Sequence, residues 1–534
     1  MALTLVHKRM MAGTDVSVKD FGAVGDGVTN DSTAIQAAID AVQTNGGSVY
    51  FPSATYICSA LEVDGGVRLY GDGNATLKRP NEDATGNKII WALRTNVPSP
   101  AAVLDTNPVI FENLIFDGNY DNQSQAGTYA LGGQSLIAFK GNATNAATDY
   151  GYMVGMVSNC SFINGTSDGI DIKNDAKVTI SNCNFRRCWR GGITVTGGRS
   201  IITASSCIID GSDFNTGIDV EPLTVGSLGR QEIEVSLSDI RVDGGLDINV
   251  RAGGHATLNN IIVDGGPYNL VCYETAAEPD SSLIASNCRF IAFDNNTISS
   301  RINCEGGRIL LDNCVFDMKT GSGGAATNDN CANVYFGGAS STFDGGEVRF
   351  SDCRFYSSST QPITGVYATQ SQANAKLFVT DCYFDASLRD AIRSENFLNY
   401  YKDNIFYNSR YAYTLNGYAA TDTETYIDGG IYECTRFANF EADYSTMKLY
   451  FTNVMHDQSL NNLDNLSATS PNPVSWGHRT IIATGTFAGA NTAGFVGDRV
   501  VLQTATAGNP VEYVCVTAGD DTNAVWKVLT TAAV

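Results

Sequence analysis

A phrase of five residues recurs along the chain, and it limits the possible fold more than any other feature. Seven copies contain cysteine: SNCSF (158–162), SNCNF (181–185), SSCII (205–209), SNCRF (286–290), DNCVF (312–316), SDCRF (351–355) and TDCYF (380–384). Each cysteine and the apolar residue two places on alternate with other side chains, the period of a half-buried strand. Successive copies, with cysteine-free versions such as SDIRV (238–242) between them, are mostly 21 to 29 residues apart. This spacing predicts a β-solenoid, in which each turn stacks on the one before.

The cysteines of the phrase are expected to point inward. Stacked turns lie about 4.8 Å apart, so Cys160, Cys183 and their equivalents would form an interior column. No two cysteines have CxxC spacing, and the chain has only four histidines. We therefore predict buried, small apolar thiols rather than a disulfide framework, and neither a metal nor a cofactor.

The charge balance limits the partners. The chain has 34 Lys and Arg against 56 Asp and Glu, a formal net charge of −22. Such a chain is not expected to bind nucleic acid, which requires clustered basic residues, although a local basic pocket remains compatible with it. No run of 18 apolar residues is present and the first residues do not read as a signal peptide, so no membrane insertion is expected.

One amphipathic helix is predicted near the N-terminus. Asn30 or Asp31 is a suitable N-cap, and Gly46-Gly47 ends the pattern. Between them Ile35, Ala38, Ile39 and Val42 fall on one face. A helix at this place would cap the open end of a solenoid, whose apolar side chains and strand edges are otherwise exposed.

The segment VKDFGAVGDGVTNDSTAIQAAIDA, followed by GGSVYFPSATY, resembles the N-terminal module of pectate-lyase-like proteins. That fold is common in bacteriophage tailspikes, capsule depolymerases and cell-wall polysaccharide enzymes. The resemblance implies an all-β, right-handed, single-stranded parallel β-helix and a homotrimer in the virion tail. It also implies a bacterial surface polysaccharide, capsule or O-antigen, as the partner, and attachment to a baseplate or another spike through the N-terminus.

Four segments are expected on this basis. Residues 1–14 form a lead-in or attachment peptide, 15–90 the first β-helix module with its capping helix, and 91–466 the catalytic or receptor-binding β-helix. Residues 467–534 form a small β-rich module that resembles the terminal module of phage spikes, where trimer clasping or carbohydrate contact is implied. A simple cap on the last turn is an equal alternative.

Aromatic residues concentrate in residues 397–451, which contain ten of the 24 tyrosines and five phenylalanines. Aromatic rings of this kind pack cores and subunit interfaces and also stack on sugars. A core or trimer interface is the preferred interpretation, and sugar binding is the alternative.

A second strand in each turn is predicted to carry the chemistry. Its copies read GIDIK (169–173), GITVT (192–196), GIDVE (217–221), GLDIN (245–249) and, more loosely, NLVCY (269–273). Their second and fourth residues would point inward and their third and fifth outward. The two outward columns are then Asp171, Thr194, Asp219, Asp247 and Val271, and beside them Lys173, Thr196, Glu221, Asn249 and Tyr273.

Asp219, Glu221 and Asp247 are the predicted catalytic residues. Adjacent turns place Asp219 about 4.8 Å from Asp247 at the backbone, and Glu221 lies two residues along the same strand. Glycosidases need two carboxyl groups roughly 5–5.5 Å apart for retention or 6.5–9.5 Å for inversion, and these acids allow either. Close carboxylates should also raise one pKa, as a general acid requires.

Further residues are predicted to contact substrate. These are Asp171, Arg251, Tyr273 and Trp189. GTSDGIDI (165–172) resembles the Asn-Thr-Asp-Gly signature of polygalacturonase-like hydrolases, which makes Asp168 a second candidate. The other signatures of those hydrolases are missing, so Asp168 is expected to be a turn residue.

A hydrolase that depolymerises a polysaccharide is therefore the leading hypothesis. A lyase is the alternative on the same scaffold, and it would draw on Arg251, His255 and Tyr273. A non-catalytic polysaccharide-binding adhesin and a secreted pectinase-like enzyme are also considered.

Overall fold

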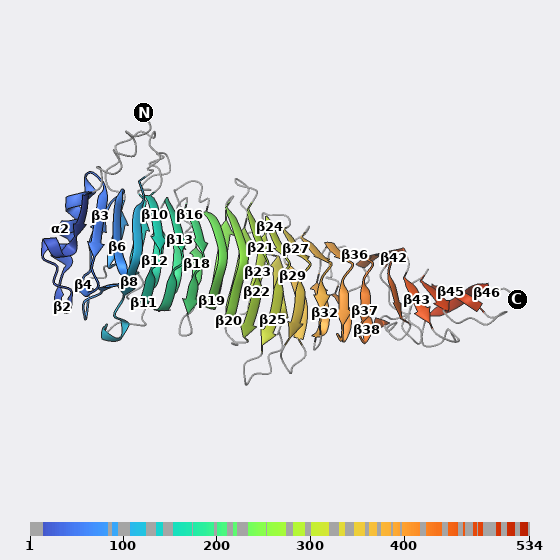
Figure 1. The fold of residues 1–534 in the computed structure, drawn as a ribbon. Helices are drawn as coiled ribbons and strands as arrows, with labels where there is room; N and C mark the ends of the chain where they lie inside the picture. Colours follow the sequence, from blue (N-terminus) through green and yellow to red (C-terminus); the bar gives the residue numbers. More distant parts are fainter. Residues whose placement is uncertain are drawn as a thin grey trace, which may run out of the picture. The chain divides into compact units, whose positions relative to one another are not determined.

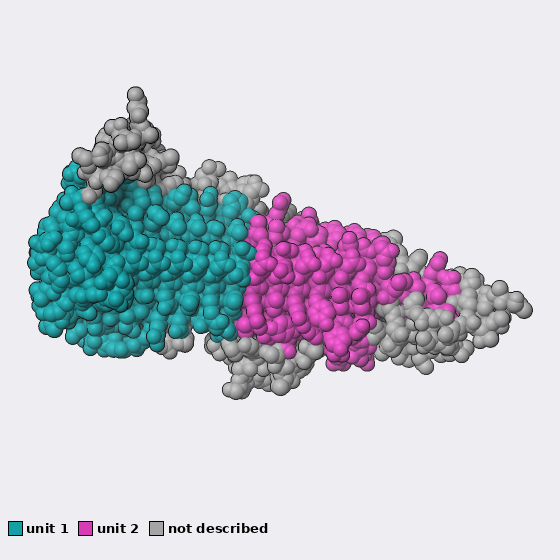
Figure 2. All heavy atoms as spheres, viewed as in Figure 1, with its two compact units in different colours: residues 1–271, 277–283 teal, residues 272–276, 284–534 magenta. Residues whose placement is uncertain are grey.

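The structure is a computed structural model. It describes residues 14–83, 88–93, 107–123, 135–141, 153–173, 175–196, 200–210, 217–221, 233–251, 254–273, 281–293, 301–319, 330–336, 346–357, 363–370, 375–385, 388–395, 398–416, 423–440, 447–457, 463–464, 474–477, 479–483, 498–502, 510–517 and 524–531. The chain divides into two compact units, coloured separately in Figure 2. Unit 1 comprises residues 1–271 and 277–283, and unit 2 comprises residues 272–276 and 284–534.

Unit 1 begins with a short strand, a 3-10 turn and one helix. β1 (Thr14–Ser17) pairs in parallel with β3 (Gly47–Phe51), which pairs in turn with β6 (Val67–Lys78). The helix α2 (Ser32–Gln43) lies at the blue end of the ribbon in Figure 1. It buries Ile35, Ala38, Ile39 and Val42, the four residues of the predicted apolar face. Its role as a cap stays a prediction.

The middle of unit 1 repeats a set of three strands. The sets are β10 (Met153–Ser158), β11 (Ser161–Gly165) and β12 (Asp168–Lys173); then β13 (Ala176–Ser181), β14 (Asn184–Cys188) and β15 (Gly191–Thr196); then β16 (Ser200–Ser205), β17 (Ile208–Asp210) and β18 (Ile218–Glu221). Each strand pairs in parallel with its counterpart in the next set, without a shift of register in the first column. β19 (Ile233–Arg251) is long enough to pair with β16, β17 and β18. The all-β prediction is confirmed, and successive turns stack in parallel as the repeat predicted.

Equivalent side chains fill the interior of these turns. Phe116, Phe162 and Phe185 stack with their ring centroids 5.1 and 4.8 Å apart. Ile170, Ile193 and Ile218 align in register and are fully buried. All 14 cysteines are buried, as the sequence predicted for most of them, and none is in a disulfide. Such columns arise because a repeat of constant strand length brings the same residue to the same place in each turn.

The residue before each phrase cysteine turns the chain. Asn159, Asn182 and Ser206 in unit 1 have φ between 52° and 54°, and Asn287, Asn313, Asp352 and Asp381 repeat this conformation further on. Asn and Asp tolerate the left-handed region better than other residues with a side chain. This explains why the phrase carries them at its second position.

Unit 2 repeats the same arrangement. One series runs through β24 (Arg308–Asp312), β27 (Glu347–Ser351), β30 (Lys376–Thr380), β33 (Leu398–Lys402), β36 (Thr423–Asp428), β39 (Met447–Thr452) and β42 (Val474–Gly477). Another runs through β26 (Asn330–Phe336), β29 (Ile363–Gln370), β32 (Leu388–Glu395), β35 (Tyr411–Asn416), β38 (Arg436–Phe440) and β41 (Leu463–Asp464). Both series are parallel throughout.

The aromatic residues of 397–451 divide between two faces. Tyr401 and Tyr413 are buried and stack at 5.2 Å inside the turns. Tyr400, Tyr426 and Tyr450 form a half-buried outer column that begins at Phe378, with centroids 4.3–4.8 Å apart. Core packing therefore accounts for one part of this segment, and the outer column remains available for contacts.

A separate five-stranded sheet ends the chain. It contains β40 (Met455–Asp457), β43 (Thr480–Ala483), β44 (Arg499–Leu502), β45 (Pro510–Thr517) and β46 (Val525–Thr531), the last three antiparallel. Arg479 and Asp498 form a fully buried ion pair beside it, and the Arg479 guanidinium lies 5.0 Å from the ring of Phe437. No described helix is long and apolar enough to cross a membrane.

Candidate functional site

The predicted outward column is present in unit 1. Asp171 of β12 aligns with Thr194 of β15, Thr194 with Asp219 of β18, and Asp219 with Asp247 of β19. The strands follow from their sequence, because the flanking Ile170 and Ile172 are fully buried and leave Asp171 on the opposite face. The predicted alignment of Asp219 with Asp247 is confirmed, and their catalytic role stays a prediction.

The column is less exposed than the sequence indicated. We expected outward side chains in a groove, but Asp171 and Asp219 are only 2% and 6% exposed. Lys173 and Arg190 contact these carboxylates and are themselves about a third exposed, 33% and 30%. The acids therefore lie beneath a cationic rim rather than on a solvated face.

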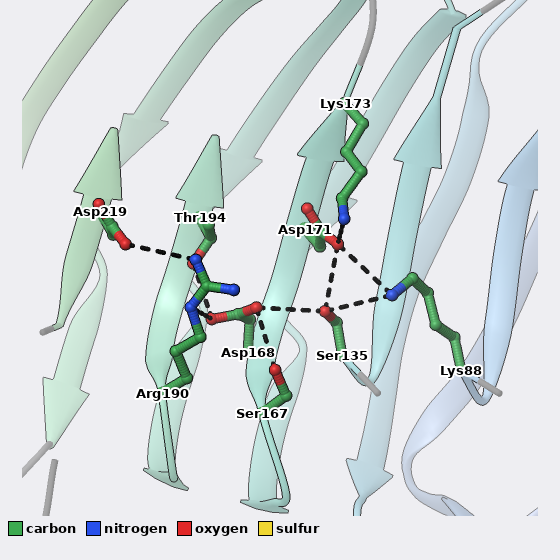
Figure 3. Close-up of polar contacts among 9 residues, drawn as sticks. All are labelled: Lys88, Ser135, Ser167, Asp168, Asp171, Lys173, Arg190, Thr194 and Asp219. Carbon is green, nitrogen blue, oxygen red and sulfur yellow. Dashed lines mark hydrogen bonds and ion pairs between the residues drawn. The ribbon is translucent and has the colours of Figure 1, made fainter. Parts of the chain in front are cut away.

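Asp168 is the centre of a buried polar cluster (Figure 3), which we define as Lys88, Ser135, Ser167, Asp168, Asp171, Lys173, Arg190, Thr194 and Asp219. Thr194 donates a hydrogen bond of 2.8 Å to Oδ1 of Asp168 from the next turn. The hydroxyl of Ser167 donates to Oδ2 at 3.2 Å. Asp168 is 1% exposed, so these hydrogen bonds replace nearly all of its contact with water.

Asp171 lies between two lysines. Its Oδ2 is 2.9 Å from Nζ of Lys173 and 3.4 Å from Nζ of Lys88. Oγ of Ser135 lies 3.3 Å from Oδ2 of both Asp168 and Asp171, so these two carboxylate oxygens are at most twice that distance apart. Oδ1 of Asp171 is buried and has no hydrogen-bond partner among the described residues.

Arg190 connects Asp168 to the outward column. Its Nε is 3.9 Å from Oδ1 of Asp168, and its Nη2 is 3.8 Å from Oδ2 of Asp219. Both distances are near the upper limit for an ion pair. Figure 3 shows it reaching from one strand to the next.

Two groups of the cluster have shifted pKa values. Burial raises the pKa of Asp168, and the charge of Asp171 adds to this, while Arg190 opposes it. Burial lowers the pKa of Lys88, against the attraction of Asp171. The Lys88 ammonium also lies 4.6 Å from the ring of Trp91. A carboxyl group with a raised pKa is suited to donate a proton, and an amine with a lowered pKa to accept one.

The other predicted residues are placed less fully. Asp247 accepts a hydrogen bond of 3.2 Å from Asn269. Glu221 aligns with Thr196, but its side chain lies outside the described residues, as do those of Arg251 and Tyr273. Trp189 is half-buried, and its backbone N–H donates to Gly165 at 2.9 Å. His255 is exposed, and its Nδ1 lies 2.9 Å from Oγ of Ser282.

The expectation that Asp168 is a turn residue was wrong. It is the first residue of β12, and its side chain is held by Ser167 and by Thr194 of the next turn. The GTSDGIDI signature was the signal for it. Lys88, Ser135 and Arg190 were missed because they precede the strands of the repeat, where nothing in the spacing indicates which side chains reach the column. Among the described residues, no three His, Cys, Asp or Glu side chains are grouped as a metal ion requires.

Comparison with known proteins finds a family likeness over the first part of the chain. The family model of rhamnogalacturonase A/epimerase, pectate lyase-like, matches residues 16–220, and every residue of the Asp168 cluster lies within that segment. The mannuronan C5-epimerase AlgE4 of Azotobacter vinelandii is 39% identical over 119 residues, 21% of this chain and 21% of the relative. Plasmin and fibronectin-binding protein A of Streptococcus pneumoniae is 29% identical over 152 residues, 25% of this chain and 21% of the relative.

The chain thus spans about a fifth of the length of these relatives. Among solved structures, tailspike protein 3 of bacteriophage CBA120 has 11% identity and a TM-score of 0.42, over 99% of this chain and 71% of that one. The comparisons support a pectate-lyase-like segment, and the names of the relatives describe polysaccharide-acting enzymes and a plasmin- and fibronectin-binding protein.

Proposed function

We propose that this protein is a phage tailspike that depolymerises a bacterial surface polysaccharide, capsule or O-antigen, by hydrolysing its glycosidic bonds. Asp168 would be the general acid and Asp219 the general base. The observation that carries the proposal is the position of Arg190 between a buried Asp168 of raised pKa and Asp219. Two carboxyl groups in different environments are what glycoside hydrolysis needs.

The chemistry follows from the two environments. Protonated Asp168 donates its proton to the oxygen of the leaving sugar. Asp219, which faces Arg190, takes a proton from the water whose oxygen attacks the anomeric carbon. Acids on opposite sides of one guanidinium suit the wider separation of about 6.5–9.5 Å that leaves room for this water, so inversion is expected.

Substrate access requires Arg190 to move. Asp168 is almost fully buried, and Arg190 and Lys173 are the exposed groups above it. The contacts of Arg190 with the two acids are long, and we infer that an arriving sugar displaces its side chain. Catalytic contacts that are loose without substrate and tighten with it are a known feature of such sites.

The scaffold and location belong to the same proposal. We infer a right-handed parallel β-helix whose first turn is capped by α2, a homotrimer, and attachment to the virion through the N-terminus. The parallel stacking and the match over residues 16–220 support the β-helix. The homotrimer and the attachment rest on the sequence resemblance to phage spikes. The predicted segments 1–14, 15–90, 91–466 and 467–534 are retained as the proposed organisation.

A lyase is the second candidate, favoured by one observation. Lys88 has a lowered pKa and lies in the cluster beside Asp171, as a base that removes a proton from a sugar would. Elimination would also use the cationic rim of Lys173 and Arg190 to neutralise a uronate carboxylate. Products distinguish the two reactions, since hydrolysis adds one water per bond and elimination leaves an unsaturated sugar.

The test is digestion of a panel of purified bacterial surface polysaccharides, with products identified by mass spectrometry. We expect fragments that each carry one added water, and at least about a hundredfold loss of rate in Asp168→Asn and Asp219→Asn. Asp243→Asn, which removes a surface carboxylate paired with Arg241, is the matched control and should cleave normally. Glu221→Gln and Asp247→Asn decide whether the acids of the sequence-based prediction contribute. Binding of a polysaccharide without cleavage of any member of the panel would contradict the enzyme and favour a non-catalytic adhesin.

A further inference from the structure

Unit 2 contains a polar arrangement built like the core of the Asp168 cluster. Asp390 of β32 is 2% exposed and accepts a hydrogen bond of 2.9 Å from Oγ1 of Thr414 on β35. In unit 1, Thr194 makes the same bond to Asp168 at 2.8 Å. In both cases the threonine comes from the next turn and is fully or almost fully buried.

The register shows that the two arrangements are equivalent position by position. Asp168 aligns with Gly191 and Asp390 with Tyr411. In each case the threonine aligns with the residue three places after the aspartate, Asp171 or Arg393. In each case an arginine, Arg190 or Arg410, stands four residues before the threonine. The two arrangements share a buried aspartate and a buried threonine of the next turn that bonds to it. They also share the register of these two residues and an arginine four residues before the threonine, so chance is a poor explanation.

The differences between them are as informative as the likeness. Asp171 is replaced by Arg393, and Asp219, which aligns with Thr194, is replaced by Asn439, which aligns with Thr414. The second arrangement therefore keeps one buried acid and loses both partner carboxylates. The pair of acids proposed for hydrolysis in unit 1 is therefore not repeated at these positions.

Arginines take the place of the missing acids. Arg410 and Arg436 contact the ring of Tyr411 from neighbouring turns, at 5.0 and 6.0 Å, and Arg436 donates its backbone N–H to the carbonyl of Arg410 at 2.8 Å. Arg393 lies 5.3 Å from the ring of Tyr367, and its Nη2 is 3.5 Å from Oε1 of Glu395. Guanidinium groups stack on aromatic faces, and they bind planar anions through two parallel hydrogen bonds. Such a concentration of arginine contrasts with the net charge of −22 of the whole chain.

We propose that unit 2 carries a second, non-catalytic saccharide site, formed by Asp390, Thr414, Arg410 and Arg436, which binds sugars bearing an anionic group. Asp390 and Thr414 position the strand, the arginines hold the anion, and Tyr411 supports them. This inference rests on the proposed action on polysaccharide for its ligand class, and on the register and contacts of unit 2 for its place.

The test uses an array of purified bacterial polysaccharides: uronate-containing, phosphate-containing and neutral. Wild type is compared with Arg410→Gln/Arg436→Gln, and the matched control is Arg349→Gln, an arginine of unit 2 that also stacks on a ring, Phe378 at 3.8 Å. The double variant should lose about tenfold or more in affinity for anionic polymers and none for neutral ones. The control should bind as wild type does. Retention on uronate or on phosphate polymers identifies which anion is bound.

Two results would overturn the inference: unchanged binding of every anionic polymer by the double variant, or an equal loss for neutral polymers. Melting temperatures of all variants establish that each is folded. Cleavage by the same proteins separates this inference from the proposed function. If polymers are bound through the arginines but none is cleaved, the second site is supported and the hydrolase is contradicted. If cleavage is normal and the double variant binds as wild type does, only the second site is contradicted.

Discussion

At the scale of single residues, Asp168 determines how the cluster responds to protons. Its carboxyl group is buried beside the charge of Asp171, and the guanidinium of Arg190 does not offset this. The folded protein therefore holds the Asp168 proton at a pH where an exposed aspartate has released it. The same property makes the residue suited to donate a proton and makes it a measurable contributor to stability.

The free energy of unfolding should report this proton. Between the ordinary aspartate pKa of about 3.9 and the raised pKa of Asp168, the folded state binds more protons than the unfolded state. Stability must then fall as pH rises through that interval and level off above it. We expect the wild type to lose stability relative to Asp168→Asn over this range, measured by urea denaturation at a series of pH values. If the stability of the wild type minus that of Asp168→Asn stays constant or increases with pH, the raised pKa is contradicted.

The residues of this site differ in how far sequence could predict them. Asp219 and Asp247 were aligned correctly because a period of two and a repeat of nearly constant length leave only one register. Lys88 and Ser135 were not predicted, since they reach the cluster from segments that precede the strands and vary between turns. Burial of Asp171 and Asp219 was also missed, because it depends on where Lys173 and Arg190 direct their side chains.

At the scale of the element, the turn before each phrase strand is the most regular feature. Asn182 has a φ of 52°, and its backbone N–H donates to Ser205 of the next turn at 3.1 Å. A residue with a Cβ and no short polar group is strained in this region. The sequence predicted these turns well, because the strain restricts the position to very few residue types.

Asn182→Ala should therefore destabilise the protein by about 1 kcal/mol, whereas Asn182→Gly should be close to neutral. Asn184→Ala is the matched control, since Asn184 is exposed and lies in the extended strand β14, where alanine costs less than about 0.5 kcal/mol. Chemical denaturation of the three variants measures these differences. Equal losses for Asn182→Ala and Asn184→Ala would show that backbone conformation is not the cause.

At the scale of the whole molecule, the thiols test the packing of both units together. All 14 cysteines are buried and free, and burial raises the pKa of Cys160 and of Cys188 to about 12. Only the thiolate reacts with disulfide reagents, so both access and ionisation protect Cys160 and Cys188, and burial limits access to the others. The sequence predicted the buried column, since the phrase itself specifies it.

Ellman's reagent should accordingly find almost no reactive thiol in the folded protein and all 14 after denaturation without reductant. Absorbance of the released thiolate provides the count. Rapid reaction of several thiols before denaturation would show that the turns open readily. A total below 14 afterwards would reveal disulfides that the structure does not contain.

The inward and outward positions of a strand have different roles, and this has a consequence for how such a chain can evolve. Inward positions such as Ile170 and Ile392 are occupied by the same residue, whereas the outward neighbours of these two differ in charge, Asp171 against Arg393. A lineage can therefore alter one face of a turn by point mutation while the packing that it inherits stays intact. Duplication of turns followed by such changes provides a short evolutionary route from one chemical surface to another, with no new fold required.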